Sequence, residues 1–333
     1  MSSYYLNKQN YLRRIFGRDD ISITESHCIV GGRAYPIVDD VIVLLDENQY
    51  PPALKARLGV ATHGQTGGQA FAEDIQFTFG EEWQRFPDIL PEHRKEFEQY
   101  FDLVDLSSLG DSLAFDLGCG IGRWSHFIKN HCGQIALVDF SEAIFVARKN
   151  LSESDNALFF MGDIKQLPFA PDCADFIFCL GVLHHLPSPA LSEIRALARF
   201  ASKILVYLYY ALDNRPAHYR IIFQVATVIR QAVCRIRSQA FRRFFTWMVA
   251  VFAYKPLALF GSALAPLGLQ SHVPLYDFYH GKSMERIRQD VYDRFFTRIE
   301  QRFSREQIRG LEDSFSSVTI SENIPYWHFL CQR

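Results

Sequence analysis

Three glycines at alternate positions, Gly118, Gly120 and Gly122, directly follow a short apolar run from Leu113 to Leu117. Glycine permits positive φ angles and lets a ligand approach the main chain closely. A helical pattern begins straight after the glycines, and the first turn of a helix offers unpaired N–H groups that suit a carboxylate or a phosphate. The segment from Leu113 to Ile128 therefore predicts a buried strand, a tight turn and a helix that together hold a nucleotide-like ligand.

Acidic residues follow at intervals that suit such a ligand. Asp116 stands near the end of the first apolar run, Asp139 ends the second run, and Asp163 follows the third. A carboxylate at Asp139 can accept both hydroxyls of a ribose, a charge-assisted pair worth on the order of 1.5–3 kcal/mol. Asp163 is placed to meet an adenine amino group. Two alternatives stay open: Asp139 as an ordinary charge at a helix start capped by Ser141, and Asp163 as a loop cap.

The spacing of the glycines argues against the nearest rival ligands. A dinucleotide site requires G-x-G-x-x-G, whereas this chain has G-x-G-x-G with Arg123 in the place of the last glycine. Arginine fits poorly where the helix must pack closely against the strand. The phosphate-binding loop that ends in Gly-Lys-Ser/Thr is also absent from the sequence.

Four segments in order resemble the class I S-adenosylmethionine-dependent methyltransferases, in the branch of small-molecule enzymes typified by quinone-biosynthesis methyltransferases. They are Asp116 to Gly122, Asp139-Phe140-Ser141, Gly162-Asp163 with Leu167-Pro168-Phe169, and Gly181-Val182-Leu183-His184-His185. The strict match covers residues 116–207, a little under a third of the chain. The resemblance implies an α/β fold with a Rossmann-like, doubly wound sheet of seven strands, the last of them antiparallel.

The resemblance also implies S-adenosyl-L-methionine as cofactor, S-adenosyl-L-homocysteine as product, and no metal. The implied cofactor contacts are Asp116, Gly118, Cys119, Gly120, Gly122, Asp139, Phe140, Asp163, Ile164 and Leu180. Tyr209 and Tyr210 end the expected fifth strand and are candidates to line the substrate pocket, with aromatic core packing as the alternative, and Tyr292 is a third candidate for this pocket.

Methyl transfer from a sulfonium is an in-line displacement, in which the protein aligns the acceptor and, for a hydroxyl acceptor, removes a proton. His184 and His185 follow the fourth strand, at the carboxyl edge where open α/β sheets bind ligands. Either histidine is a candidate general base. The alternative is that the pair only shapes this loop and the start of the next helix.

Strands and helices that alternate along the sequence are expected to hold these residues in place. Expected strands are Ile135–Val138, Leu158–Met161, Ala174–Leu180 and Lys203–Tyr209, and expected helices are 91–101, 142–151 and 189–200. Apolar strands without alternation indicate a parallel sheet covered by helices on both faces. The rhythm stops after Asp213 and resumes near Ser304 with a helix over 304–311 and strands over 317–321 and 326–331.

The rest of the chain divides into three further parts. Residues 1–46 are expected to form a small β-rich module with strands at 22–29, 34–38 and 41–45, which resembles a degenerate zinc-ribbon-like module. Only Cys28 remains there as a metal ligand, so zinc is not expected, and a plain β-hairpin appendage is the alternative. Residues 47–80 predict a linker with a mobile loop, since they hold Pro51-Pro52 and a Gly, Thr and Gln-rich run over 62–69. Residues 81–333 form the expected methyltransferase domain.

An insertion over 214–297 is expected to be a helical lid over the acceptor. Residues 214–276 contain no Asp or Glu but hold seven arginines and Lys255, which leaves the rest of the chain at −10. An amphipathic basic helix near 221–236 precedes an apolar stretch over 244–269. Attachment to anionic lipid and docking of an acidic carrier protein or a phosphorylated substrate are alternatives. Lys255-Pro256 argues against a membrane span, and no nucleic acid is expected because the net charge is −2.

The expected activity is methyl transfer to a hydrophobic or aromatic small molecule, preferably on oxygen. Two alternatives remain: a non-catalytic scaffold with this fold, and a methyltransferase that acts on a lipid-bound or carrier-bound substrate at the membrane surface. The seven cysteines include no C-x-x-C pair, and residues 1–10 lack a signal-peptide core. These features predict a cytoplasmic protein, with peripheral attachment to the inner membrane surface as the alternative.

Overall fold

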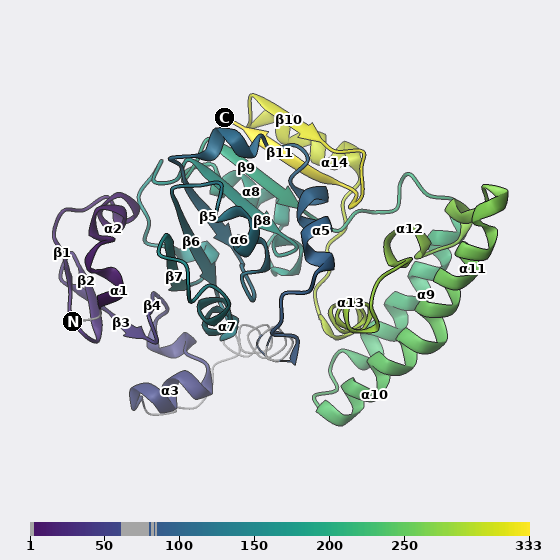
Figure 1. The fold of residues 1–333 in the computed structure, drawn as a ribbon, viewed down its shortest axis with the longest axis horizontal. Helices are drawn as coiled ribbons and strands as arrows, with labels where there is room; N and C mark the ends of the chain where they lie inside the picture. Colours follow the sequence, from purple (N-terminus) through teal and green to yellow (C-terminus); the bar gives the residue numbers. More distant parts are fainter. Residues whose placement is uncertain (1–2, 61–79, 81–82, 84) are drawn as a thin grey trace.

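The fold is seen in a computed structural model that describes residues 3–60, 80, 83 and 85–333 (Figure 1). A central sheet carries helices on its faces, the N-terminal strands lie at one edge, and a group of helices from the insertion lies to the other side (Figure 1). The predicted mobile loop over 62–69 lies outside the described residues.

Within the described residues the sheet has eleven strands, in the order β1-β2-β3-β4-β7-β6-β5-β8-β9-β11-β10. Seven of them match the predicted doubly wound core: β5 (Leu113–Leu117), β6 (Gln134–Asp139), β7 (Ala157–Met161), β8 (Phe176–Leu180), β9 (Lys203–Tyr207), β10 (Ser317–Ile320) and β11 (His328–Gln332). The strands β7, β6, β5, β8 and β9 run parallel, and β11 pairs antiparallel with β9. The predicted parallel sheet with an antiparallel last strand is therefore confirmed.

The helices that cover this sheet are α5 (Glu92–Tyr100), α6 (Arg123–Ile128), α7 (Ala143–Asn150), α8 (Ala190–Leu197) and α14 (Arg305–Arg309). Successive side chains of a strand point to opposite faces, so β5 contributes to two cores. Phe115 belongs to one hydrophobic cluster and Ala114 to the other, and both are fully buried. The strand sequences are continuously apolar because helices cover both faces of the sheet.

The N-terminal part is not a separate appendage. It comprises α1 (Ser3–Leu6), α2 (Gln9–Phe16), β1 (Ile21–Ile23), β2 (His27–Val30), β3 (Arg33–Val38) and β4 (Val41–Val43). Strand β4 pairs in parallel with β7, with Ile42 opposite Phe160, so these strands continue the central sheet. The expected single strand over 22–29 is wrong, because the His27 N–H donates to Thr24 Oγ1 (2.9 Å) and closes a turn between β1 and β2. Cys28 is buried in β2, and the resemblance of this part to a zinc-ribbon-like module stays a prediction.

The expected linker is partly helical. It contains the 3-10 turn η1 (Glu47–Gln49) and the helix α3 (Pro52–Leu58), which begins on a proline. Proline suits the first turn of a helix because its missing N–H would have no partner there. The two adjacent prolines, which predicted a break, therefore start a helix.

The insertion is helical as predicted. Its elements are α9 (Ala217–Val233), α10 (Gln239–Val249), the π-helical turn η5 (Ala250–Tyr254), α11 (Lys255–Leu264), η6 (Ala265–Leu267), η7 (Gln270–His272), α12 (Tyr276–Tyr279) and α13 (Met284–Phe296). Lys255-Pro256 does not end the helix, because η5 widens the turn and α11 continues. In the part of the chain that the structure describes, one helix, Gln239–Leu267, is long and apolar enough to cross a membrane, and 22% of its most apolar window is buried.

Helix α9 is oriented opposite to the usual amphipathic pattern. Arg230 is buried, and its Nη1 donates to the carbonyl oxygens of Thr297 (3.0 Å) and Arg298 (2.8 Å). Val225 and Val228, in contrast, are 57% and 66% exposed. The basic side chain therefore ties α9 to the segment after α13, while much of the apolar face remains accessible.

Candidate active site

A cavity of about 870 Å³ extends from the glycine turn to the insertion. Its walls come from the loops after β5, β6, β7, β8 and β9 and from helices α9 to α13. In a parallel sheet the carboxyl ends of neighbouring strands meet at one edge, which is where open α/β sheets bind ligands. The fold thus gathers residues from five loops and the insertion around one space.

The glycine turn has the backbone that its sequence predicts. Gly118, Gly120 and Gly122 have φ angles of 80°, 53° and 74°, which other residues rarely adopt. A Cβ on Gly118 would lie 2.4 Å from Val182 Cγ2, so the turn also requires a residue without a side chain. Gly118, Cys119 and Gly120 line the cavity, whereas Gly122 precedes α6 and faces the core beside Leu151. Gly122 therefore supports the turn from the core side, and its expected cofactor contact stays a prediction.

Asp139, at the end of β6, is held before any ligand arrives. Its carboxylate accepts hydrogen bonds from the Gly120 N–H (2.8 Å), the Ser141 N–H (2.8 Å) and the Ser141 hydroxyl (2.7 Å). The residue is only 8% exposed, and burial raises its pKa despite these donors. Ser141 Oγ also accepts from the Ala143 N–H (3.2 Å), so the capping role weighed from the sequence exists beside the site.

Asp116 does not line the cavity. It is 1% exposed in β5, and its carboxylate accepts a hydrogen bond of 2.6 Å from the Ser125 hydroxyl of α6. Burial raises the pKa of Asp116 to about 7, against the lowering effect of the Ser125 hydrogen bond. In this position Asp116 joins β5 to α6 behind the glycine turn, and its expected cofactor contact stays a prediction.

The remaining predicted cofactor residues lie on the cavity wall: Phe140, Asp163, Ile164 and Leu180. Asp163 also accepts from the Lys165 N–H (2.9 Å) and so caps the short turn η3 (Ile164–Gln166). Its capping role and its position on the wall are compatible, because the cap leaves one carboxylate oxygen outside that bond.

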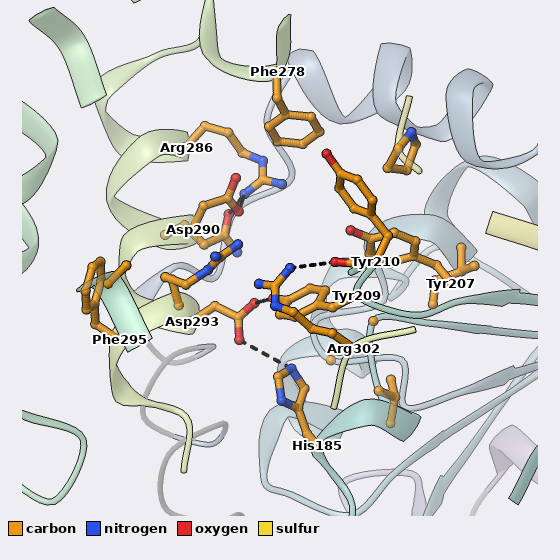
Figure 2. A pocket seen from close by; sticks show the side chains of 18 of the residues that line it. His185, Tyr207, Tyr209, Tyr210, Phe278, Arg286, Asp290, Asp293, Phe295 and Arg302 are labelled. Carbon is orange, nitrogen blue, oxygen red and sulfur yellow. Dashed lines mark hydrogen bonds and ion pairs between the residues drawn. The ribbon is translucent and has the colours of Figure 1, made fainter. Parts of the chain in front are cut away.

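The two histidines sit in the turn η4 (Leu183–His185) but in different environments. His185 lines the cavity, with Nδ1 2.8 Å from the carbonyl oxygen of Ile299 and Nε2 3.7 Å from Asp293 Oδ1 (Figure 2). His184 is fully buried outside the cavity wall, with its ring 3.9 Å from that of Tyr209. Burial lowers the pKa of His184 well below its ordinary value, and of the two candidates only His185 lines the cavity.

The three tyrosines predicted for the substrate pocket lie in two different environments. Tyr209 and Tyr210, just after β9, line the cavity, and the Tyr209 hydroxyl donates to the Asp293 carboxylate of α13 (Figure 2). Tyr292 is fully buried among the insertion's own hydrophobic side chains, where its hydroxyl accepts from Arg242 Nη1 at 2.6 Å. The expected pocket position of Tyr292 is wrong because the opposite face of α13 points to the cavity.

Sequence reasoning missed the charged residues on that face. Arg286, Asp290, Asp293 and Arg294 of α13 all line the cavity, together with Arg215 and Arg302. Figure 2 labels Arg286, Asp290, Asp293 and Arg302 among them. The four charged residues of α13 are separated by four, three and one positions, which places them on one side of a helix. This spacing was the sequence signal that could have indicated a charged face. Arg286 pairs with Glu96 of α5 through two contacts of 3.0 and 3.1 Å. Burial alone would raise the pKa of Glu96, but Arg286 and Lys282 lower it to about 2.

This wall fits S-adenosylmethionine by its chemistry. Gly118 and Gly120 present main chain without side chains, and a Cβ on Gly120 would lie 3.0 Å from Trp83 Cε2. The fixed carboxylate of Asp139 suits the ribose hydroxyls, and Phe140, Asp163 and Ile164 would surround the adenine. Gly118 and Gly120 would lie against the methionine part.

Comparisons with known proteins bear on the class of this domain. Residues 114–202 match the methyltransferase domain family. The chain is 28% identical over 160 residues to the ubiquinone biosynthesis O-methyltransferase of Stutzerimonas stutzeri (strain A1501), a match that covers 46% of this chain and 67% of that protein. Residues 114–202 therefore form a methyltransferase domain, and these matches support a class I enzyme with S-adenosylmethionine as its cofactor.

Solved structures show weaker likeness. Magnesium protoporphyrin IX methyltransferase from Synechocystis PCC 6803 is 13% identical, with 84% of this chain and 92% of that chain covered and a TM-score of 0.39. A protein from Pyrococcus horikoshii OT3 is 24% identical, with 38% of this chain covered and a TM-score of 0.34. That match spans 64% of the Pyrococcus protein, slightly less than two thirds of its length.

Proposed function

We propose that this protein transfers a methyl group from S-adenosylmethionine to an oxygen of a hydrophobic or aromatic small molecule. One observation carries the proposal: a single cavity contains both the cofactor wall around Asp139 and an aromatic wall from β9 and the insertion. The aromatic wall includes Tyr207, Tyr209, Phe223 and Phe278. An acceptor ring between such faces would lie beside the donor, and alignment is the main contribution of a protein to this reaction.

The cofactor supplies a methyl group already activated on a sulfonium. His185 is the proposed base, because its Nδ1 must donate to the Ile299 carbonyl (2.8 Å), which leaves Nε2 as the acceptor in a neutral ring. Nε2 would take the hydroxyl proton of the acceptor, and Asp293, 3.7 Å away, would stabilise the resulting positive charge. The relative from Stutzerimonas stutzeri is an O-methyltransferase by name, which supports oxygen as the methylated atom.

The test is incubation of the protein with isotope-labelled S-adenosylmethionine and a host metabolite extract, followed by separation of the labelled products. We expect label in a compound that carries a methoxy group or a methyl ester. If the His185→Ala variant forms the labelled product at an unchanged rate and with an unchanged pH profile, His185 is not the base. Binding of S-adenosylhomocysteine without any transfer would favour the non-catalytic scaffold.

A second candidate is methyl transfer at a membrane surface, favoured by the exposed apolar side chains of the insertion. Val228, Phe252 and Leu259 are 66%, 68% and 67% exposed. Arg220 and Arg243 are exposed on the same insertion, which has no acidic residue before Asp277. Apolar side chains beside basic ones favour anionic lipid surfaces. Flotation with anionic liposomes at low salt tests it, and recovery only in the unbound fraction would reject it.

A further inference from the structure

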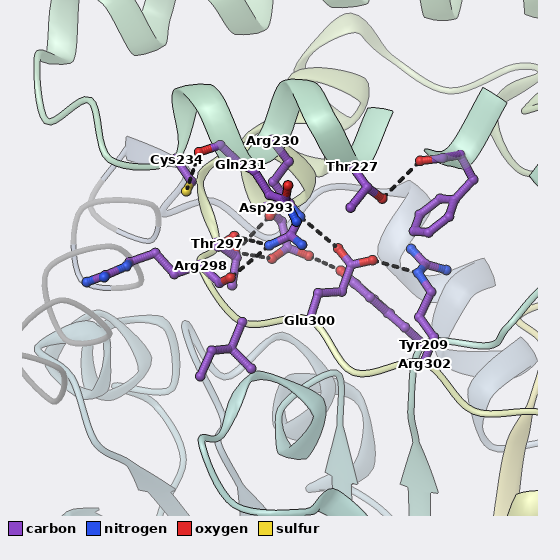
Figure 3. Close-up of polar contacts among 12 residues, drawn as sticks. Tyr209, Thr227, Arg230, Gln231, Cys234, Asp293, Thr297, Arg298, Glu300 and Arg302 are labelled. Atoms are coloured by element: carbon purple, nitrogen blue, oxygen red, sulfur yellow. Dashed lines mark hydrogen bonds and ion pairs between the residues drawn. The ribbon is translucent and has the colours of Figure 1, made fainter. Parts of the chain in front are cut away.

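The acceptor end of the cavity contains several arginines, and most of them have a carboxylate partner. Arg215 pairs with Asp277 (2.7 Å), and Arg286 pairs with Glu96 and Asp290. Arg302 Nε pairs with Glu300 (2.6 Å, Figure 3). A guanidinium without such a partner is therefore an exception on this wall.

Arg294 is that exception. It lines the cavity from α13, with its Cζ 5.6 Å from the ring centre of Tyr209 and 5.5 Å from that of Phe223. Among the described residues no hydrogen bond or ion pair within 4.0 Å holds its guanidinium. Cations favour the faces of aromatic rings, but these contacts leave all five N–H donors of the group unused.

Arg302 lies beside the same two rings and is also incompletely satisfied. Its Cζ is 3.8 Å from the ring centre of Phe223 and 5.2 Å from that of Tyr209. Nε donates to Glu300 and Nη1 to the carbonyl oxygen of Tyr210 (2.9 Å), whereas Nη2 is buried without a partner in the described part of the chain. Burial and then the neighbouring charge of Arg294 lower the pKa of Arg302, whereas the contact with Glu300 raises it.

The two nearby carboxylates each have a hydrogen-bonded partner, but Glu300 Oε2 has no hydrogen bond among the described residues, and the charge of Glu300 also acts on Arg294 without a direct contact. Asp293 accepts from the Tyr209 hydroxyl and faces His185, and Glu300 serves Arg302 and lies 4.0 Å from Arg230 (Figure 3). Two adjacent guanidinium groups thus share one direct ion pair. A buried donor without a partner costs free energy, and an arriving anion would remove that cost.

We propose that Arg294 and Arg302 bind an anionic group of the methyl acceptor, a carboxylate or a phosphate, while Tyr209 and Phe223 pack against its apolar part. The planar fork of arginine suits both anions because each can accept two parallel hydrogen bonds. The inference rests on the proposed function and narrows the acceptor from any hydrophobic molecule to an aromatic or apolar acid.

Calorimetry on the full chain with bound S-adenosylhomocysteine tests this subsite, with benzoate, phenyl phosphate and benzyl alcohol as probes. We expect one of the two anions to bind at least about tenfold more tightly than benzyl alcohol, with an affinity that falls as salt rises. Benzoate and phenyl phosphate distinguish a carboxylate from a phosphate site. Arg294→Gln is expected to remove the preference for the anion, and Arg294→Lys to restore part of it.

Arg243→Gln is the matched control, because this arginine is exposed on α10 and does not line the cavity. It should leave all three probe affinities unchanged. Equal affinity for benzoate, phenyl phosphate and benzyl alcohol, no binding of either anion, or retention of the preference in Arg294→Gln would overturn the proposal. If Arg294→Gln does not fold, as judged by circular dichroism, Arg302→Gln replaces it with the same criteria. If the protein prefers the anionic probes but transfers no methyl group, only the proposed function is refuted. If it transfers a methyl group but does not prefer the anionic probes, only the anion subsite is refuted.

Discussion

The Gly120 N–H donates a hydrogen bond of 2.8 Å to the Asp139 carboxylate. This bond joins the glycine turn after β5 to the acid at the end of β6, two segments that sequence analysis could relate only by their spacing. Because Ser141 supplies two further donors, the carboxylate has a fixed orientation in the free protein. A fixed acceptor binds a ligand with less loss of conformational freedom.

Gly118→Ala is expected to damage the turn by crowding as well as by backbone strain. Gly118 and Gly32 have similar φ angles of 80° and 82°, but a Cβ on Gly118 meets Val182 at 2.4 Å while one on Gly32 meets nothing within 4 Å. Gly32→Ala is thus the matched control and should cost about 1–2 kcal/mol of unfolding free energy through strain alone. Gly118→Ala should cost clearly more in chemical denaturation. Equal losses in the two variants would show that the contact with Val182 does not matter.

Asp116→Asn is expected to change how stability depends on pH. Burial raises the pKa of Asp116 in the folded protein to about 7, above its ordinary value of 3.8. Between these values the native state retains a proton that the unfolded chain has lost. The contribution of Asp116 is therefore greatest at low pH and declines as pH rises towards 7, by up to about 1.4 kcal/mol per pH unit.

Denaturation of wild type and Asp116→Asn from pH 4 to 8 measures this effect as a difference, which cancels other titrating groups. Among those groups, burial lowers the pKa of His93 to about 3 and gives the opposite slope. Asp155→Asn, at an exposed position, is the control and should follow the wild-type curve. A difference that does not change with pH would contradict the burial argument.

Tyr209→Phe is expected to lower kcat/KM for the acceptor by about tenfold or more, because it removes the bond to Asp293 that joins β9 to α13. Affinity for S-adenosylhomocysteine should not change. Tyr292→Phe is the control: it also loses a hydroxyl bond, to Arg242, but away from the cavity wall. We expect it to lower stability and leave kcat/KM intact. If Tyr292→Phe lowers kcat/KM and Tyr209→Phe leaves it intact, the acceptor would lie against the other face of α13.

Much of the sheet could be predicted because its strands are buried on both faces. Strand β5 was expected over Leu113–Leu117 and has those bounds, since a continuous apolar run bounded by a glycine turn allows few alternatives. Helix α2 was missed because only Leu12, Ile15 and Phe16 of its eight residues are buried, and the rest are polar. The pairing of β4 with β7 is a long-range contact that no local pattern reports.

The site residues also divide into those that local sequence indicates and those that depend on the three-dimensional fold. Gly118, Gly120 and Asp139 were predictable because their roles depend on backbone geometry and strand ends. Gly122 and Asp116 share the motif but face the core, and sequence spacing does not show which way a side chain points. His184 and His185 are adjacent, yet only His185 reaches the cavity. The position of Arg286 on the cavity wall was missed because its partner Glu96 comes from α5, far away in the chain.

The central claim is that the wall around Asp139 binds the cofactor. Calorimetric titration of S-adenosylhomocysteine into wild type, Asp139→Asn and the exposed control Asp155→Asn tests it most directly. The wild type and Asp155→Asn should bind with equal affinity, and Asp139→Asn should bind at least about tenfold more weakly while remaining folded. Equal affinity of all three proteins, or no binding by any of them, would contradict the claim.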